Sequence, residues 1–157
     1  MPRLIVCLMP VIVLLGLAQM GEAALVITEI MYKPSGVNKT NANTAATSDE
    51  WFEVFNAGPS SVNLANIKID DDADASDGIS LNGTLGSGKY AIVANNTAAN
   101  WATVFGTLPV GTLFVQPAGI WNSLADGGEN LTLFSTLTGT NFFTLNYTHP
   151  QRNGVSV

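Results

Sequence analysis

The chain has 157 residues, of which 46% are hydrophobic and 11% are charged, and its formal net charge is −6. This length suits one domain with a buried core. With 6 Lys and Arg residues against 12 Asp and Glu residues, no basic patch is expected, which argues against direct binding to nucleic acid or to an anionic membrane.

The first residues have the layout of a secretory signal peptide. Arg3 precedes an apolar run over residues 4–18, and small residues lead to a predicted cleavage point after Ala23. The run is shorter than the roughly 20 residues that a membrane-spanning helix needs, so cleavage is preferred over an uncleaved anchor. We therefore predict a signal peptide at residues 1–23 and one domain at residues 24–157, which is secreted, periplasmic or at the cell surface and has no membrane contact after cleavage.

Cys7 is the only cysteine of the chain, and it lies inside the apolar run. Cleavage of the signal peptide would remove it. The exported domain would then contain no disulfide, and its stability would depend on core packing.

The remainder of the chain is predicted to form many short strands. The first covers residues 25–32, and a polar stretch at 37–48 follows as an exposed loop. Further strands are expected at residues 51–56, 62–69, 79–81, 90–94, 112–115, 130–134 and 142–147, with turns rich in Gly, Asn and Asp between them. One short helix is expected at residues 97–105, where Trp101, Val104 and Phe105 share a face. This pattern predicts an all-β fold, an antiparallel β-sandwich with one short helix.

The strand at residues 51–56 carries large apolar groups on both of its faces. Side chains alternate along a strand, so the two faces are Phe52, Val54 and Asn56, and Trp51, Glu53 and Phe55. We therefore expect this strand to be covered on both sides.

Five segments carry a resemblance to a known family. They read ITEIMYKP at residues 27–34, EWFEVFN at 50–56, VNLANIKID at 62–70, LGSGKYAIV at 85–93 and LADGGENLTL at 124–133. In this order they resemble the bacterial lamin-tail domain, an immunoglobulin-like module that is also found at the tail of nuclear lamins. The resemblance covers most of residues 24–157 and implies an immunoglobulin-like sandwich without a catalytic pair.

The sequence departs from that family at two places. Asn66 and Ile67 stand where the family usually has Gly and Trp, which changes one core side chain. The sequence ends at Val157, where the last strand of the family would be starting, so we expect a C-terminally incomplete domain with a truncated last strand. A missing strand would leave an unpaired edge that invites pairing with another chain.

Three acids of the first two strands are candidates for catalysis. A glycosidase-like pair among Glu29, Glu50 and Glu53 would need carboxyl groups roughly 5 to 10 Å apart in a cleft. The alternative is that these acids accept hydrogen bonds within the fold, as buried acids normally do. We prefer the second interpretation and predict no catalytic residue.

An acidic stretch at residues 70–78 reads DDDADASDG and suggests a calcium site. Carboxylate oxygens suit calcium, although the glycine and glutamate that an EF-hand loop requires are missing in both registers. The candidate ligands are Asp70, Asp72, Asp74 and Asp77. The alternative is a solvated loop without a ligand, and no other cofactor is expected.

Aromatic residues offer a candidate sugar-binding surface. Trp51, Trp101, Trp121 and Tyr147 would form one if they faced solvent, but large aromatics in a small sandwich more often belong to the core. Trp121 precedes a turn and is the candidate binding residue. A Ser-His-Asp arrangement is not expected, because His149 is the only histidine and no serine stands in a G-x-S-x-G motif.

These observations predict an exported, non-catalytic module for protein interaction or for attachment to a surface or substrate, as an accessory part of a larger secreted protein. Its partner would be a protein or a polysaccharide surface. One alternative is a calcium-dependent carbohydrate-binding or adhesion domain, which requires exposed Trp rings beside the acidic loop. The other is a small secreted carboxylate-dependent hydrolase, which requires two acids in one cleft with strongly shifted pKa values.

Overall fold

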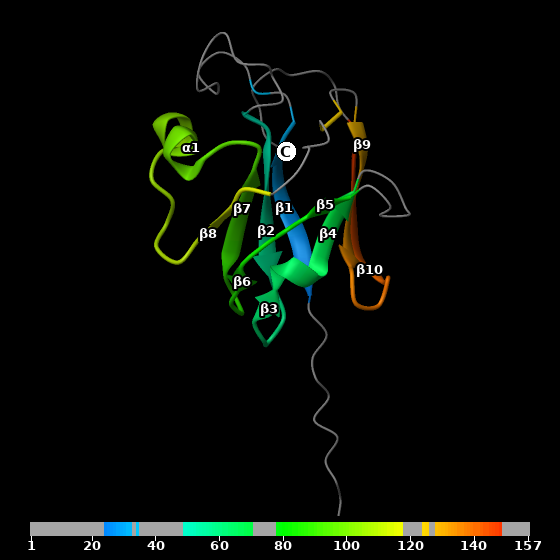
Figure 1. Cartoon of the computed structure of the whole chain (residues 1–157). Helices are drawn as coiled ribbons and strands as arrows, with labels where there is room; N and C mark the ends of the chain where they lie inside the picture. The colour runs from blue at the N-terminus through cyan, green and yellow to red at the C-terminus, as the bar shows by residue number, and fades with distance from the viewer. Residues whose placement is uncertain are drawn as a thin grey trace, which may run out of the picture.

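The computed structural model describes residues 24–32, 34, 49–70, 78–117, 124–125 and 128–148. Two four-stranded sheets form the framework of this part of the chain, and they pack around a shared core (Figure 1). The predicted all-β, immunoglobulin-like sandwich with one short helix is confirmed. The expected truncation of the last strand concerns residues after 148, which lie outside the described residues.

The first sheet contains the strands β1 (Leu25–Met31), β2 (Trp51–Asn56), β7 (Tyr90–Ala94) and β8 (Leu113–Val115), in the order β1-β2-β7-β8. The β7 and β8 strands are parallel, whereas the other pairs of this sheet are antiparallel. Parallel strands need a crossover connection, which here contains the helix α1 (Ala98–Phe105). The predicted bounds of β2 and β7 agree with the structure, and the predicted helix is one residue longer because Thr97 caps its N-terminus.

The second sheet contains β10 (Asn141–Thr148), β9 (Gly128–Ser135), β4 (Ile67–Asp70) and β5 (Ile79–Ser80), in this order. The predicted strand at residues 62–69 is divided into β3 (Val62–Asn63), the 3₁₀ turn η3 (Leu64–Asn66) and β4. The division arises because the Asn63 side chain accepts a hydrogen bond from Ala65 N at 3.1 Å and thereby caps the turn. The β3 strand pairs with β6 (Thr84–Leu85), which the sequence pattern did not reveal.

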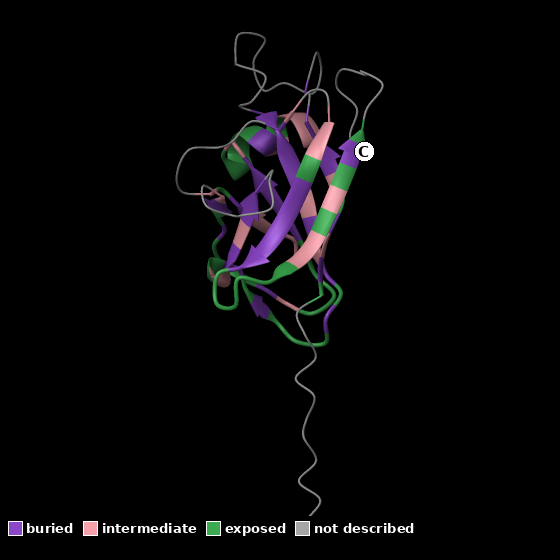
Figure 2. Cartoon of the chain, turned by 90° about the vertical axis from the view of Figure 1, so that its right-hand side faces the viewer, coloured by how far each residue is buried: buried purple, intermediate pink, exposed green. Residues whose placement is uncertain are grey.

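The core lies between the inner faces of the two sheets. Phe52 and Val54 of β2 meet Ile69 and Leu133 of the opposite sheet in one cluster of buried side chains. In Figure 2, β9 is buried over most of its length, whereas the neighbouring β10 alternates between exposed and half-buried positions. The alternation fits a strand that presents one face to the core and one to solvent.

Asn56 is the polar residue that β2 contributes to the interior, and it is fully buried. Its Nδ2 donates to the carbonyl oxygens of Ser60 (2.8 Å) and Leu85 (3.0 Å), while its Oδ1 accepts from Gly58 N (3.0 Å). Because every polar atom of this side chain has a partner, Asn56 secures the turn after β2 without an unsatisfied buried group.

The helix α1 covers one end of the outer face of the first sheet. The Trp51 ring of β2 packs edge-on against Trp101 and Phe105 of α1, with ring centroids 5.9 and 5.5 Å apart. The expectation that β2 is covered on both sides is thus met at this end. No helix in the described ranges is long and apolar enough to cross a membrane.

Candidate functional site

A groove of about 380 Å³ opens on the outer face of the first sheet, next to the part that α1 covers. Its lining includes the acids Glu29 and Glu53, the indoles of Trp51 and Trp101, and Tyr90 and Thr112. We call it the acidic groove. It contains two of the three acids that the sequence singled out, and it places them among aromatic side chains.

A β-bulge at Thr28 brings the two acids together. The register runs from Ile27 opposite Val54 directly to Glu29 opposite Glu53, so Thr28 is an extra residue with no opposite residue in β2. Side chains alternate between the faces of a strand, and a regular ladder would therefore place Glu29 on the same side as Ile27, toward the core. The bulge turns Glu29 to the outer face instead, as bulges next to functional sites do.

The two carboxylates have few partners among the described residues. Glu53 Oε1 accepts a hydrogen bond from Thr28 Oγ1 at 2.7 Å. The Glu29 side chain has no hydrogen bond, and neither acid has an ion pair, within the part of the chain that the structure describes. Lys89, which precedes Tyr90, has its Nζ beside Gly111 rather than beside either acid. The groove therefore holds two acids on neighbouring strands, and no described residue forms an ion pair with either of them.

The indole N–H groups of Trp51 and Trp101 have no acceptor among the described residues. Trp51 is 5% exposed and Trp101 is 8% exposed, and both Nε1 atoms are buried. Their rings meet edge-on at an interplanar angle of 78°, so they do not form the flat, exposed platform that sugar stacking needs. Tyr147 is also buried, and Trp121 lies outside the described residues, so its predicted binding role stays a prediction.

Glu50 is separated from the other two acids. It is 2% exposed, and its Oε2 accepts a hydrogen bond from Leu124 N at 3.0 Å. This is the hydrogen-bonding role that we preferred for it. Glu50 thus connects the start of β2 to the segment before β9. The structure does not place Glu50 and Glu53 in one cleft as a catalytic pair.

A partly buried polar network near Glu50 was not foreseen. The hydroxyl of Tyr147 donates to Glu129 Oε1 at 2.7 Å and lies 3.2 Å from Ala125 O. Burial raises the pKa of Tyr147 well above its usual range, and the negative charges of Glu129 and Glu50 raise this pKa further. The signal in the sequence was weak, because Glu129 and Tyr147 become opposite partners only through the register of β9 and β10.

Of the four predicted calcium ligands, the structure describes Asp70 alone. Asp70 ends β4, is 2% exposed and lies against Gly78, where an added Cβ would come within 2.6 Å of Asp70 Oδ2. Asp72, Asp74 and Asp77 lie outside the described residues. Within the described ranges no group of three or more His, Cys, Asp or Glu side chains is placed to hold a metal ion, and the calcium site stays a prediction.

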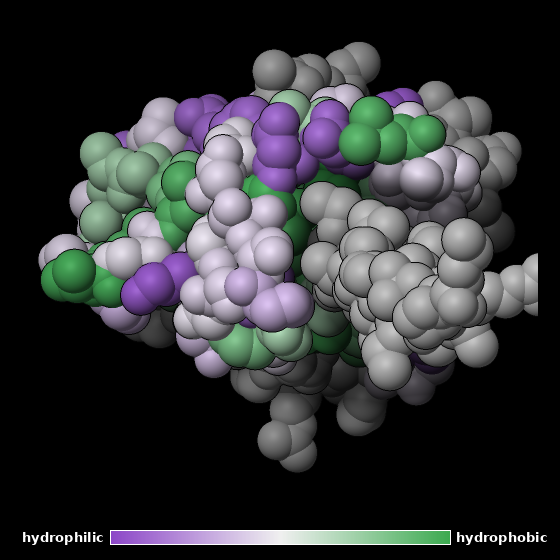
Figure 3. Space-filling view, turned by 90° about the horizontal axis from the view of Figure 1, so that it is seen from below, coloured by the Kyte–Doolittle hydropathy of each residue, from purple (hydrophilic) through white to green (hydrophobic). Residues whose placement is uncertain are grey.

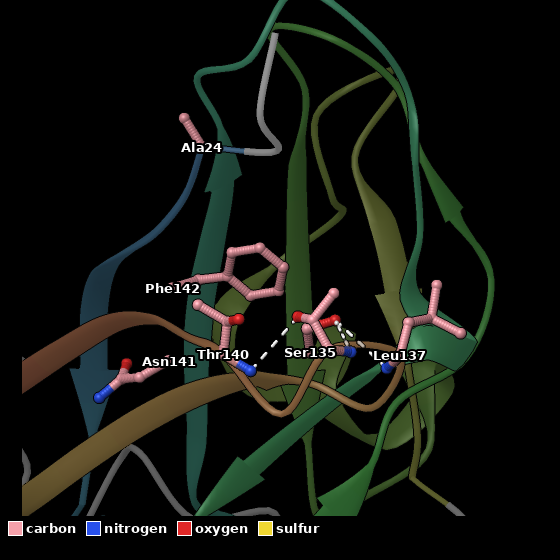
Figure 4. A pocket seen from close by; sticks show the side chains of 7 residues that line it. Ala24, Ser135, Leu137, Thr140, Asn141 and Phe142 are labelled. Carbon is pink, nitrogen blue, oxygen red and sulfur yellow. Dashed lines mark hydrogen bonds between the residues drawn. The ribbon is translucent and has the colours of Figure 1, made fainter. Parts of the chain in front are cut away.

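A second hollow, of about 530 Å³, lies at the end of the sandwich where β9 turns into β10. Phe142, Ser135 and Ala24 are among its lining residues (Figure 4), and none of the lining side chains is charged. Ser135 Oγ accepts from Leu137 N and Thr138 N, at 3.3 and 3.2 Å, so its hydroxyl supports the turn. Figure 3, viewed from below, shows hydrophobic atoms scattered between polar ones rather than one apolar patch. Unlike the acidic groove, this hollow therefore has no charged side chain among its described lining residues that could bind a ligand.

Comparison with known proteins assigns the fold to a family. The model of the Lamin Tail Domain family (LTD) matches residues 18–149, which is more than half of the chain. No curated protein and no solved structure matches the chain. The family consists of non-catalytic, immunoglobulin-like domains that generally act in protein interaction. Its match agrees with the two sheets described above, and the chain belongs to the lamin tail domain family.

Proposed function

We propose that this chain is an exported, non-catalytic accessory module that attaches a larger secreted protein to a partner at a surface or on a substrate, and that the acidic groove is its attachment site. The family supports an interaction role. The predicted signal peptide supports export, and Leu25, the first residue of β1, comes directly after the predicted cleavage region.

The observation that carries the proposal is that Glu29 lies opposite Glu53 on neighbouring strands. Like charges directly opposite each other in a sheet are destabilising, by roughly 0.2 to 1 kcal/mol. A pair of this kind on an outer face, bordered by Trp51 and Tyr90, is better explained by a bound partner than by folding. The outer face then serves binding, while the inner face of the same strands serves the core.

If the domain were a hydrolase, the same pair of acids would have to be its catalytic residues. Glu50 is engaged in the interior by Leu124 N, which leaves Glu29 and Glu53 as the two acids of one groove. Binding is preferred over hydrolysis because the family is non-catalytic. A hydrolase would lose turnover of a glycoside substrate when either acid becomes Gln, whereas a binding module has no turnover to lose.

Two measurements test the proposal with the full chain, expressed in the organism that makes it. N-terminal sequencing of the exported form should find Ala24 as the first residue. Fractionation should find the wild-type chain on the cell surface or on an insoluble substrate, and a Glu29→Gln/Glu53→Gln variant in the medium. Equal attachment of the two forms would overturn the role of the groove, and retention of residues 1–23 would overturn the export step.

A further inference from the structure

We propose that the acidic groove recognises an arginine side chain in an extended, basic segment of a partner protein. This inference rests on the proposed function, because it names the chemistry of the partner that would occupy the same groove. It is carried by the two carboxylates, by the aromatic border of the groove and by the charge of the whole chain.

The first argument is the chemistry of the acid pair. Glu29 and Glu53 come from adjacent, paired positions, and neither has an ion pair among the described residues. A guanidinium group is planar and carries five N–H donors, so one group can donate to two carboxylates at once. An incoming arginine would therefore remove the repulsion between the acids and form charge-assisted hydrogen bonds with both.

The second argument is the aromatic border of the groove. Guanidinium groups stack on aromatic rings more readily than ammonium groups do, and Tyr90 is 41% exposed at the groove. The groove thus offers a guanidinium group an exposed aromatic ring beside the two carboxylates.

The third argument decides between a basic peptide and a neutral sugar. The net charge of −6 attracts a cationic partner at long range but gives a neutral sugar no advantage. A sugar gains most from an exposed, flat aromatic face, and the two indoles of the groove are buried and edge-on. The observations therefore favour the arginine segment, and sugar binding becomes an outcome of the test.

The test is an NMR titration of the exported chain labelled with ¹⁵N. The probes are three peptides of glycine and serine that differ at one central residue, which is arginine, lysine or the neutral isostere citrulline, and cellohexaose as a neutral sugar. The readouts are the indole N–H signals of Trp51 and Trp101, assigned with Trp→Phe variants. We expect the arginine peptide to shift both signals and to bind about tenfold more tightly than the citrulline peptide, since a charged hydrogen bond is worth more than a neutral one.

Variants complete the design. Glu29→Gln and Glu53→Gln should each weaken binding of the arginine peptide by about tenfold. Glu129→Gln is the matched control, because it removes the same charge from the second sheet and its amide oxygen still accepts from the Tyr147 hydroxyl. It should bind the arginine peptide like the wild type.

Three results would overturn the inference. They are equal binding of the citrulline and arginine peptides, equal binding of the lysine and arginine peptides, and no binding of the arginine peptide by a folded chain. If cellohexaose instead shifts the indole signals and this response is lost in Glu29→Gln, the groove is a sugar site. In that case the inference fails while the proposed attachment role of the groove stands. Failure of the attachment role itself would appear in the fractionation experiment as equal attachment of the wild type and the double variant.

Discussion

The buried carboxylate of Glu50 accepts a hydrogen bond from the backbone N–H of Leu124 at 3.0 Å, across 74 residues of sequence. This bond holds the segment before β9 against the start of β2. It also removes Glu50 from the acids that are available on the outer face. Of the three candidate acids, Glu29 and Glu53 therefore remain in the acidic groove.

Glu50→Ala should lower the free energy of unfolding, because it leaves the buried Leu124 N–H without its acceptor. The expected loss is about 2 kcal/mol, within the range for an unsatisfied buried polar group. Glu50→Gln keeps an acceptor oxygen and should lose less. Urea unfolding measures both variants, and equal stability of wild type and Glu50→Ala would show that this bond contributes nothing.

Tyr147 should make the stability of the domain fall in alkaline solution. Its pKa is raised in the folded state above the ordinary value of 10.0, by burial first and then by Glu129 and Glu50. The folded state therefore holds the proton more tightly than the unfolded state does. The resulting contribution to stability is complete below pH 10 and is lost as the pH rises above it.

Tyr147→Phe removes the titrating group, so the variant should lose less stability than the wild type between pH 9 and about 11. At pH 7 it should be less stable by about 1 kcal/mol, since the bond to Glu129 is gone. Thermal unfolding at a series of pH values measures both effects. Parallel pH profiles of the two proteins would contradict the assignment.

Glu29→Gln should stabilise the isolated domain, because it removes the like-charge pair with Glu53. The expected gain is roughly 0.2 to 1 kcal/mol at low ionic strength and should shrink as salt is added, since salt screens exposed charges. Urea unfolding at low and at high ionic strength measures this gain. A variant that gains stability while it loses attachment would show that the groove is kept for binding.

The predicted calcium site at Asp70, Asp72, Asp74 and Asp77 is tested by thermal unfolding in millimolar calcium and in chelator. A ligand that binds the folded state raises its stability according to its concentration and affinity. If calcium binds, the unfolding temperature should be higher in calcium, and Asp72→Asn should reduce this difference. An unfolding temperature that is unchanged between the two conditions would rule the site out.

Much of the fold is visible in the sequence, because β2 and β7 are short runs rich in aromatic and β-branched residues that end at clear turns. The short pairing of Val62 with Leu85 is not visible in the sequence, since a strand of two residues is too short to show a periodic pattern. The acidic groove is only partly visible in the sequence. Thr28 and Glu29 are consecutive polar residues between the apolar residues 25–27 and 30–31, and this interruption coincides with the bulge. The opposition of Glu29 and Glu53 depends on register, which the local pattern of one strand does not fix.

The bulge also allows the outward-facing and the inward-facing residues of β1 to change independently in evolution. Thr28 has no opposite residue in β2, so a variant without it would retain every opposite pair of β1 and β2 and lose the hydrogen bond from Thr28 to Glu53. Residues that face solvent on these strands touch one set of neighbours, and residues that face inward touch another. Selection is thus free to alter what the domain recognises while the packing that keeps it folded is inherited unchanged.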